Sequence, residues 1–244
     1  MTNHVVLNIQ DHAKLKVNSQ YSANLGDNIS NTLTFPTEFA AVQREYPILF
    51  SKNPETGQFQ SVVLFGLKSD ENLFLNNGTW QANYIPSVIT KGPFAIGFEQ
   101  KNDTDDKYQQ TPIVYIDLNN PKVNDTEGDS IFTQGENSAY LNKVSQALIT
   151  IHDGNQVSQP MFDAFNEHDL IEPISLDIEL NNGEKISIGG NYTINGEKLA
   201  KLSGNALEKL NNAGFLSLAF FVSSSLNNVQ NLVDKKNQQL DLAK

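Results

Sequence analysis

The spacing of apolar residues changes at Ser138, and this change constrains the fold of the 244-residue chain more than any other feature. Before Ser138, apolar residues form short runs of strand composition, such as Gln58–Leu67. After it they recur every three or four residues, as in an amphipathic helix, at Tyr140, Leu141, Val144, Ala147, Leu148 and Ile151. Strands and helices in separate blocks predict an α+β fold with a mixed or antiparallel sheet.

The part before Ser138 is predicted to hold short strands separated by turns. Residues 1–34 form a polar arm with two strand-like pieces, Val5–Ile9 and Leu15–Val17. Residues Thr37–Arg44 predict a short helix capped by the Thr, and Tyr84–Thr90 a short helix or irregular segment. Further strands are expected at Tyr46–Phe50, Gln58–Leu67, Asn72–Leu75, Phe94–Phe98 and Ile113–Leu118. An acidic loop over 101–110 joins the last two of them.

The part after Ser138 is predicted to be mainly helical. A second helix can begin at Pro160, with Ser158 as its cap. The alternation in Ile174–Leu180, followed by Asn181-Asn182-Gly183 and Glu184–Ile188, predicts a β-hairpin. The tail from Glu197 reads as helices broken at Ser203-Gly204 and Ala213-Gly214, with a last segment from Phe215 to Leu232. We expect one compact domain over residues 1–244, with any internal seam at 119–135.

Composition excludes several classes of protein. The chain has no cysteine, so it has no disulfides, thiolate metal sites or cysteine nucleophile. Its longest apolar stretch, Gly214–Leu226, is 13 residues long, whereas a membrane span needs about 20. This stretch predicts a buried core helix. The alternative is a helix at the membrane interface, but such a helix would be flanked by Lys and Arg, whereas this stretch is flanked by Asn, Ser and Gln. The amino terminus does not resemble a secretory signal, so we expect a cytoplasmic protein without membrane insertion.

The charge of the chain argues against nucleic acid as a partner. The formal net charge is −11, and Arg44 is the only arginine among 17 basic residues. A polyphosphate would be repelled by such a surface. An acidic excess by itself favours solubility and does not identify a basic partner.

The residues with catalytic potential do not form a known motif. The four histidines, His4, His12, His152 and His168, lack the spacing that a helical zinc site or a facial triad needs. The acidic turn at 125–129 differs from a calcium loop in the position of its glycine. No nucleophile elbow or phosphate-binding glycine loop is present. We therefore predict no metal and no cofactor, and the catalytic residues, if the chain is an enzyme, are unknown.

Five residues form a candidate binding site. Arg44, Glu45 and Tyr46 follow the first predicted helix, and Trp80 and Tyr84 lie in a loop-like region. Arginine and large aromatic side chains dominate binding hot spots. If a short helix carries Trp80 and Tyr84 one turn apart, their side chains form a wall for a peptide or an aromatic ligand. Two alternatives remain open: the aromatic residues are packing residues, and Glu45 neutralises Arg44 in a salt bridge.

Four long segments of the chain are similar to the bacterial SapC family. They are FPTEFAAVQREYPILFSKNPETGQF (35–59), ENLFLNNGTWQANYIPSVITKGPFAIGFE (71–99), FDAFNEHDLIEPISLDIELNNGEK (162–185) and NYTINGEKLAKLSGNALEKLNNAGFL (191–216). The family takes its name from a protein linked to bacterial surface layers. Its members occur near genes for halogenase-like and cupin-like enzymes and TonB-dependent receptors. The peptide-transporter permease and the saposin that share the name differ from this chain, which lacks their membrane spans and cysteines.

The resemblance implies a function but no reaction and no catalytic residue. It implies a non-catalytic binding or accessory protein with a protein or peptide partner, associated with surface-layer or outer-membrane uptake systems. The alternative is a metal-dependent enzyme that modifies a peptide or small molecule. Stoichiometric iron or zinc in the purified protein would favour the enzyme. The oligomeric state is left open.

Overall fold

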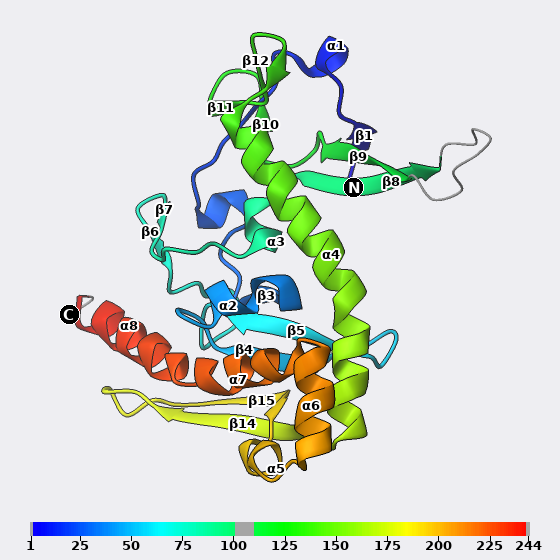
Figure 1. Cartoon of the computed structure of the whole chain (residues 1–244). Coiled ribbons are helices and arrows are strands. Elements are labelled where there is room, and N and C mark those ends of the chain that lie inside the picture. The colour runs from blue at the N-terminus through cyan, green and yellow to red at the C-terminus, as the bar shows by residue number, and fades with distance from the viewer. Residues whose placement is uncertain (1, 101–109, 243–244) are drawn as a thin grey trace.

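A long helix, α4 (Ala139–Glu167), runs through most of the molecule and carries a hydrophobic core at each end (Figure 1). The computed structural model describes residues 2–100 and 110–242. Its antiparallel sheets and carboxy-terminal helices confirm the α+β fold. Within the described residues, no helix combines the length and the apolar character that crossing a membrane requires.

Helix α4 starts where the sequence predicts but does not stop at Pro160. Ser138 is its N-cap, and the Ser138 hydroxyl accepts a hydrogen bond from the Leu141 amide. The predicted second helix beginning at Pro160 is wrong, because Pro160 lies inside α4 and the Ser158 hydroxyl bonds the Gly154 carbonyl. A proline inside a helix costs about 3 kcal/mol. Burial of Phe162 and Phe165, which follow it, offsets that cost.

The larger core, which we call the sheet core, lies around a five-stranded sheet in the order β14-β15-β4-β5-β3. Phe50 of β4 lies opposite Ser61 of β5, and the Phe50 ring packs edge-on against Phe162 of α4. The predicted hairpin is confirmed as β14 and β15, with a register shift between Ile174 and Leu176. The strands of the sheet are β3 (Asn31–Leu33), β4 (Ile48–Lys52), β5 (Phe59–Leu64), β14 (Ile171–Glu179) and β15 (Lys185–Ile194).

Four carboxy-terminal helices complete this part of the molecule. They are α5 (Gly196–Ala200), α6 (Gly204–Asn212), α7 (Phe215–Ser225) and α8 (Asn228–Leu242). The breaks at 203–204 and 213–214 are confirmed, but the predicted single segment from Phe215 to Leu232 is two helices. At the division, the Ser225 hydroxyl accepts from the Ile48 amide and the Asn228 amide donates to the Gln43 and Tyr46 carbonyls. These bonds attach the helix ends to the start of β4, and helical periodicity does not reveal them.

The smaller core, which we call the small core, packs against the first half of α4. Its buried residues are Val17, Phe94, Ile116, Ile131, Leu141, Val144 and Leu148. Its sheet is β1-β9-β8, formed by β1 (His4–Val6), β8 (Phe94–Gln100) and β9 (Gln110–Asp117). The predicted acidic loop lies outside the described residues over 101–109. The other strands here are β2 (Lys16–Val17), β10 (Val123–Asn124), β11 (Asp129–Ser130), β12 (Phe132–Thr133) and β13 (Glu136–Asn137).

The proposed seam at 119–135 contains β10, β11 and β12, together with the fully buried Ile131. The segment is therefore part of the small core, and the domain division stays a prediction.

Short elements between the strands differ most from the sequence prediction. The predicted Thr-capped helix over Thr37–Arg44 is a 3-10 turn, η2 (Pro36–Glu38), followed by α2 (Phe39–Val42). The Thr37 hydroxyl donates to the Thr150 carbonyl of α4 and caps nothing. The predicted strand at Asn72–Leu75 is largely a turn. The remaining short elements are α1 (Ile9–His12), η1 (Ala23–Leu25), β6 (Leu75–Asn76), β7 (Thr79–Trp80) and α3 (Ser87–Thr90).

Candidate functional site

Tyr46 lies at the centre of the five predicted site residues. Its side chain is fully buried. The Tyr46 hydroxyl accepts a hydrogen bond from Trp80 Nε1 at 2.7 Å and donates one to the Tyr84 carbonyl at 2.6 Å. Burial raises the pKa of Tyr46 above its usual range, so the phenol stays protonated and keeps donating. Trp80 is 7% exposed and packs edge-on against Phe65. Both side chains belong to the core, so a partner cannot reach them.

Glu45 fixes the loop that follows β7. Its carboxylate accepts hydrogen bonds from the backbone amides of Asn83 and Tyr84, each at 3.0 Å. The loop also corrects the predicted short helix, because Trp80 ends β7 and Tyr84 lies before α3 in a segment without helical structure. Trp80 and Tyr84 therefore do not form a helical wall.

Arg44 is exposed at the end of α2. Glu45 does not act as its partner, because no ion pair or side-chain hydrogen bond of Arg44 occurs within residues 2–100 and 110–242. The guanidinium is thus available to a partner, whereas the other four predicted residues are engaged inside the protein. Whether the five residues bind anything stays a prediction.

A buried carboxylate that the sequence analysis missed completes this cluster. Glu38 is 3% exposed. It accepts hydrogen bonds from the Thr34 hydroxyl at 2.9 Å, the Tyr84 hydroxyl at 2.7 Å and the Ser87 amide at 2.9 Å. Burial and the neighbouring charge of Glu38 raise the pKa of Tyr84 above its usual range. A buried carboxylate with these donors is a structural anchor. Its sequence context, inside the expected short helix Thr37–Arg44, gave no signal of burial.

The histidines are dispersed. His12 is buried and its Nδ1 lies 3.1 Å from the Asn8 carbonyl oxygen. His152 contacts the Phe98 ring, with ring centroids 4.1 Å apart, and its Nε2 lies 2.7 Å from Gln156 Nε2. Among the described residues, no three His, Asp or Glu side chains are grouped so that they could hold a metal ion.

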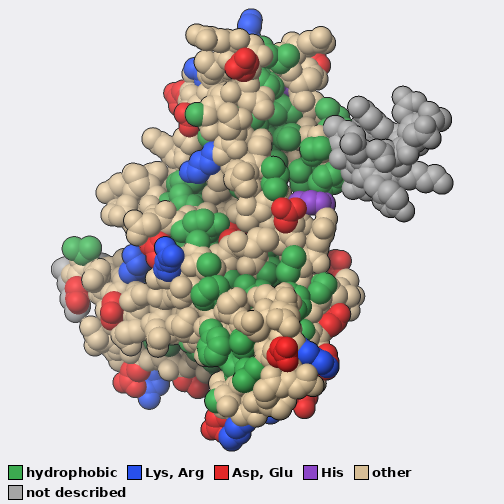
Figure 2. All heavy atoms as spheres, viewed as in Figure 1, with side chains coloured by type: hydrophobic (Ala, Val, Ile, Leu, Met, Phe, Trp, Pro, Cys, Tyr) green, Lys and Arg blue, Asp and Glu red, His purple; other side chains and the backbone are tan. Residues whose placement is uncertain are grey.

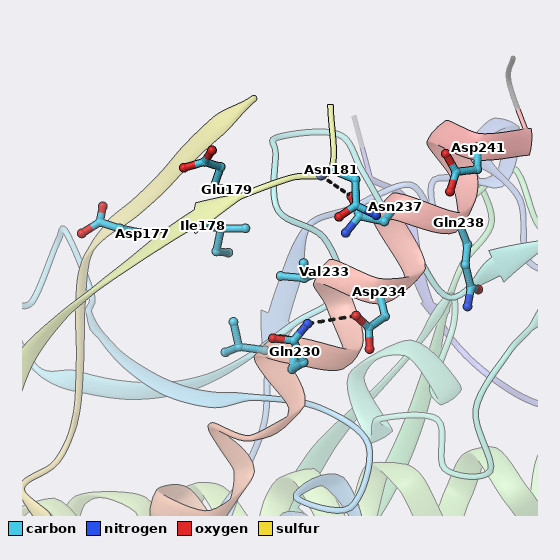
Figure 3. A pocket seen from close by; sticks show the side chains of 11 residues that line it. Asp177, Ile178, Glu179, Asn181, Gln230, Val233, Asp234, Asn237, Gln238 and Asp241 are labelled. Carbon is cyan, nitrogen blue, oxygen red and sulfur yellow. Dashed lines mark hydrogen bonds between the residues drawn. The ribbon is translucent and has the colours of Figure 1, made fainter. Parts of the chain in front are cut away.

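A groove between β14 and α8 has a volume of about 630 Å³ (Figure 3). Ile178 and Val233 point toward one another across it, whereas Asp177 and Glu179 point to the other side of the strand. β14 is an edge strand, and it carries a proline at 173, a bulge and outward acidic side chains. Such features prevent another strand from pairing with an edge. The groove therefore offers no continuous strand-binding edge.

Helix α7 presents an apolar surface, and its last turn contacts the residue before Arg44. Phe220 is 55% exposed, and Leu216, one turn earlier on the same face, is half-buried. Figure 2 shows hydrophobic side chains gathered over α7. One turn after Phe220, the Ser224 hydroxyl donates to Gln43, the residue before Arg44, at 3.1 Å. The α7 surface, defined as Leu216, Phe220 and Arg44, thus combines exposed apolar area with a guanidinium that has no partner in the described part of the chain.

Comparison with known proteins identifies one family. The family model SapC matches residues 7–232. None of the curated proteins and none of the solved structures compared with the chain matches it.

Proposed function

The chain belongs to the SapC family, and on that premise we propose that it is a non-catalytic binding or accessory protein that works through a protein partner. The α7 surface is the observation that supports this proposal. Seven of the eleven residues of α7, FLSLAFFVSSS, are apolar, and a helix so rich in apolar residues is normally buried. Its Phe220 nevertheless faces solvent. An exposed apolar patch beside polar residues is typical of a protein interface.

The chemistry of the α7 surface favours one kind of partner. Phe220 would fill an apolar pocket on the partner, and Arg44 would bind a carboxylate next to that pocket in the bidentate geometry that guanidinium favours. A second copy of this chain is a poorer occupant, because each copy carries a net charge of −11. We therefore propose a different protein that presents an apolar side chain beside Asp or Glu.

The setting of this function is also a proposal. The family's name and gene neighbourhoods favour a cytoplasmic accessory protein of surface-layer or outer-membrane uptake systems. The partner would then be a protein or a peptide of such a system.

Site-specific photocrosslinking in the native cell can identify this partner. A photoreactive phenylalanine at position 220 is expected to capture one protein. The same group at position 149, where Ile149 is 44% exposed on α4, is the matched control and is expected to capture none. Capture only of a second copy of the chain, or equal capture at both positions, would overturn the proposal. So would turnover of a peptide or small molecule by the purified protein.

Arg44→Lys separates a binding role from a structural one. Lysine keeps the charge but loses the planar fork. We expect the partner identified by crosslinking to bind the purified Arg44→Lys variant about tenfold more weakly. The melting temperature should be unchanged, because Arg44 is exposed. A melting temperature several degrees lower, with unchanged partner affinity, would show that Arg44 is structural.

A further inference from the structure

A second groove, separate from the α7 surface, lies between α4 and the turn that joins β4 to β5. Its volume is about 420 Å³, within the range of roughly 300–1,000 Å³ that is usual for ligand pockets. The chain has 45 charged side chains, 17 basic and 28 acidic, yet none of the described residues that line this groove is charged. Its walls carry amide and hydroxyl groups together with Leu33, Phe35 and Phe59.

One of the lining hydroxyls is buried without a partner. Ser61 is 4% exposed, and its Oγ makes no hydrogen bond within the described part of the chain. Buried polar atoms in folded proteins almost always have a partner, so such an atom calls for an explanation. Ser61 lies opposite Phe50, whose ring contacts α4, so its side chain is on the α4 side of the sheet and lines the groove.

Two further groups of the groove, both on exposed residues, also lack a hydrogen-bond partner among the described residues. The side-chain amides of Asn155 on α4 and Gln58 before β5 make no hydrogen bond with the described residues. By contrast, Gln159 donates to Asp163, Gln60 donates to Ser51, and Asn53 accepts from two amides of its own turn. Two side-chain amides and one hydroxyl, from three segments of the chain, therefore line one groove without a hydrogen-bond partner in the part of the chain that the structure describes.

The close packing of α4 on η2 holds one wall of this groove in place. A Cβ atom on Gly154, next to Asn155, would come within 2.4 Å of the Phe35 Cβ and 2.5 Å of the Thr37 hydroxyl oxygen. Glycine thus allows α4 to approach the segment before α2. The hydrogen bond from Thr37 to the Thr150 carbonyl, at 2.8 Å, fixes the same contact.

From this geometry we propose that the groove binds a neutral carbohydrate of one or two sugar rings. A neutral sugar offers hydroxyls that both donate and accept, which matches the two amides and the serine hydroxyl. Its C–H faces suit the apolar area of Leu33, which is 38% exposed, and the half-buried Phe59. A sugar phosphate or uronic acid would find no cationic partner among the groups that line the groove. The ligand is thus polar, uncharged and rich in hydroxyl groups.

The test is ligand-observed NMR on the full chain with maltose, cellobiose and N,N′-diacetylchitobiose, with glucuronic acid as the charged control. We expect at least one neutral disaccharide to bind with a Kd of about 1 mM or below, and glucuronic acid not to bind. Maltoheptaose, tested beside maltose, distinguishes a free disaccharide from a ring within a longer glycan. Binding of the free disaccharide and binding of the longer glycan each support the proposal.

Three variants connect the binding to the groove. Ser61→Ala and Asn155→Ala are each expected to weaken disaccharide binding about three- to tenfold. Ser61→Ala should leave the melting temperature of the free protein equal or higher, because it removes a buried unpaired donor. Thr193→Val is the matched control: Thr193 Oγ1 is the other buried hydroxyl without a partner in the described residues, and it lies outside the groove lining. We expect Thr193→Val to leave binding unchanged.

Several results would overturn the proposal. One is that no neutral disaccharide binds at up to about 50 mM, far above a Kd of 1 mM. Another is that glucuronic acid binds more strongly than the neutral disaccharides. A third is that wild type, Ser61→Ala and Asn155→Ala bind a disaccharide equally well. Binding of a neutral Gly-Ser-Asn peptide without any sugar would also overturn it and assign the groove to peptides. None of these results depends on the α7 surface.

Discussion

At the scale of single residues, a buried ion pair attaches the amino-terminal arm to the segment before β10. Lys122 Nζ lies 2.7 Å from Asp27 Oδ1, and the two side chains are 9% and 7% exposed. The Ser22 amide donates to the other Asp27 oxygen at 2.9 Å, and the Lys122 ammonium lies 4.9 Å from the centroid of the Tyr21 ring. This pair connects residues 95 positions apart in the sequence.

Lys122→Met tests the importance of this pair. The variant leaves the Asp27 carboxylate buried without its cation, which typically costs about 3–5 kcal/mol of unfolding free energy. Urea unfolding is expected to show this loss, and the double variant Asp27→Asn/Lys122→Met should recover part of it. Lys201→Met, which breaks the exposed Lys201–Glu197 pair, is the control and should change stability by less than about 1 kcal/mol. Equal effects of the two lysine variants would contradict the structural role of the buried pair.

Single residues also show why the site was only partly predictable. Arg44 was recognisable as the only arginine, and its exposure agrees with a binding role. The bond between Trp80 and Tyr46 joins residues 34 positions apart, and nothing in local sequence predicts it. It was equally impossible to predict that the Ser61 hydroxyl lacks a hydrogen-bond partner in the described residues, because a serine within an apolar strand run does not indicate which side chains surround it.

At the scale of elements, local patterns succeeded where local chemistry decides the structure. The β14–β15 hairpin follows from alternation and from Asn181-Asn182-Gly183, in which Gly183 has a φ of 82° that the turn requires. The start of α4 follows from its Ser138 cap. Patterns failed where distant contacts decide, as at Pro160 inside α4 and at the division between α7 and α8.

The contact between α4 and η2 gives a prediction at this scale. Gly154→Val is expected to destabilise the protein by about 2–4 kcal/mol, because the side chain overlaps Phe35 and the Thr37 hydroxyl. Thermal unfolding monitored by circular dichroism measures the loss. The control is Gly204→Val at the start of α6, where an added Cβ meets nothing within 4 Å. If both variants melt at the wild-type temperature, α4 does not pack as closely as described.

At the scale of the whole molecule, the carboxy-terminal helices belong to the sheet core. Ala219, Val222 and Leu232 are fully buried in it. Removing residues 215–244 is expected to expose the apolar surface that these helices cover and to yield insoluble protein. Removing only 241–244 is the control and should leave the protein soluble, because Leu242 is 88% exposed. A soluble chain that ends at 214 and melts at the wild-type temperature would contradict this assignment.

The two cores differ in when their residues become available during synthesis. Leu148 is the last buried residue of the small core along the chain, so this core has its full set once the first half of α4 has been made. The sheet core contains Phe39 and Phe50 from early in the chain, yet it requires residues as late as Leu232. On a ribosome, β4 and β5 therefore emerge long before α7 and α8. Until translation ends, their apolar side chains lack the residues of α7 and α8 that complete the sheet core. The small core can therefore fold first. At that stage the second half of α4 still lacks the later helices and strands against which it will pack.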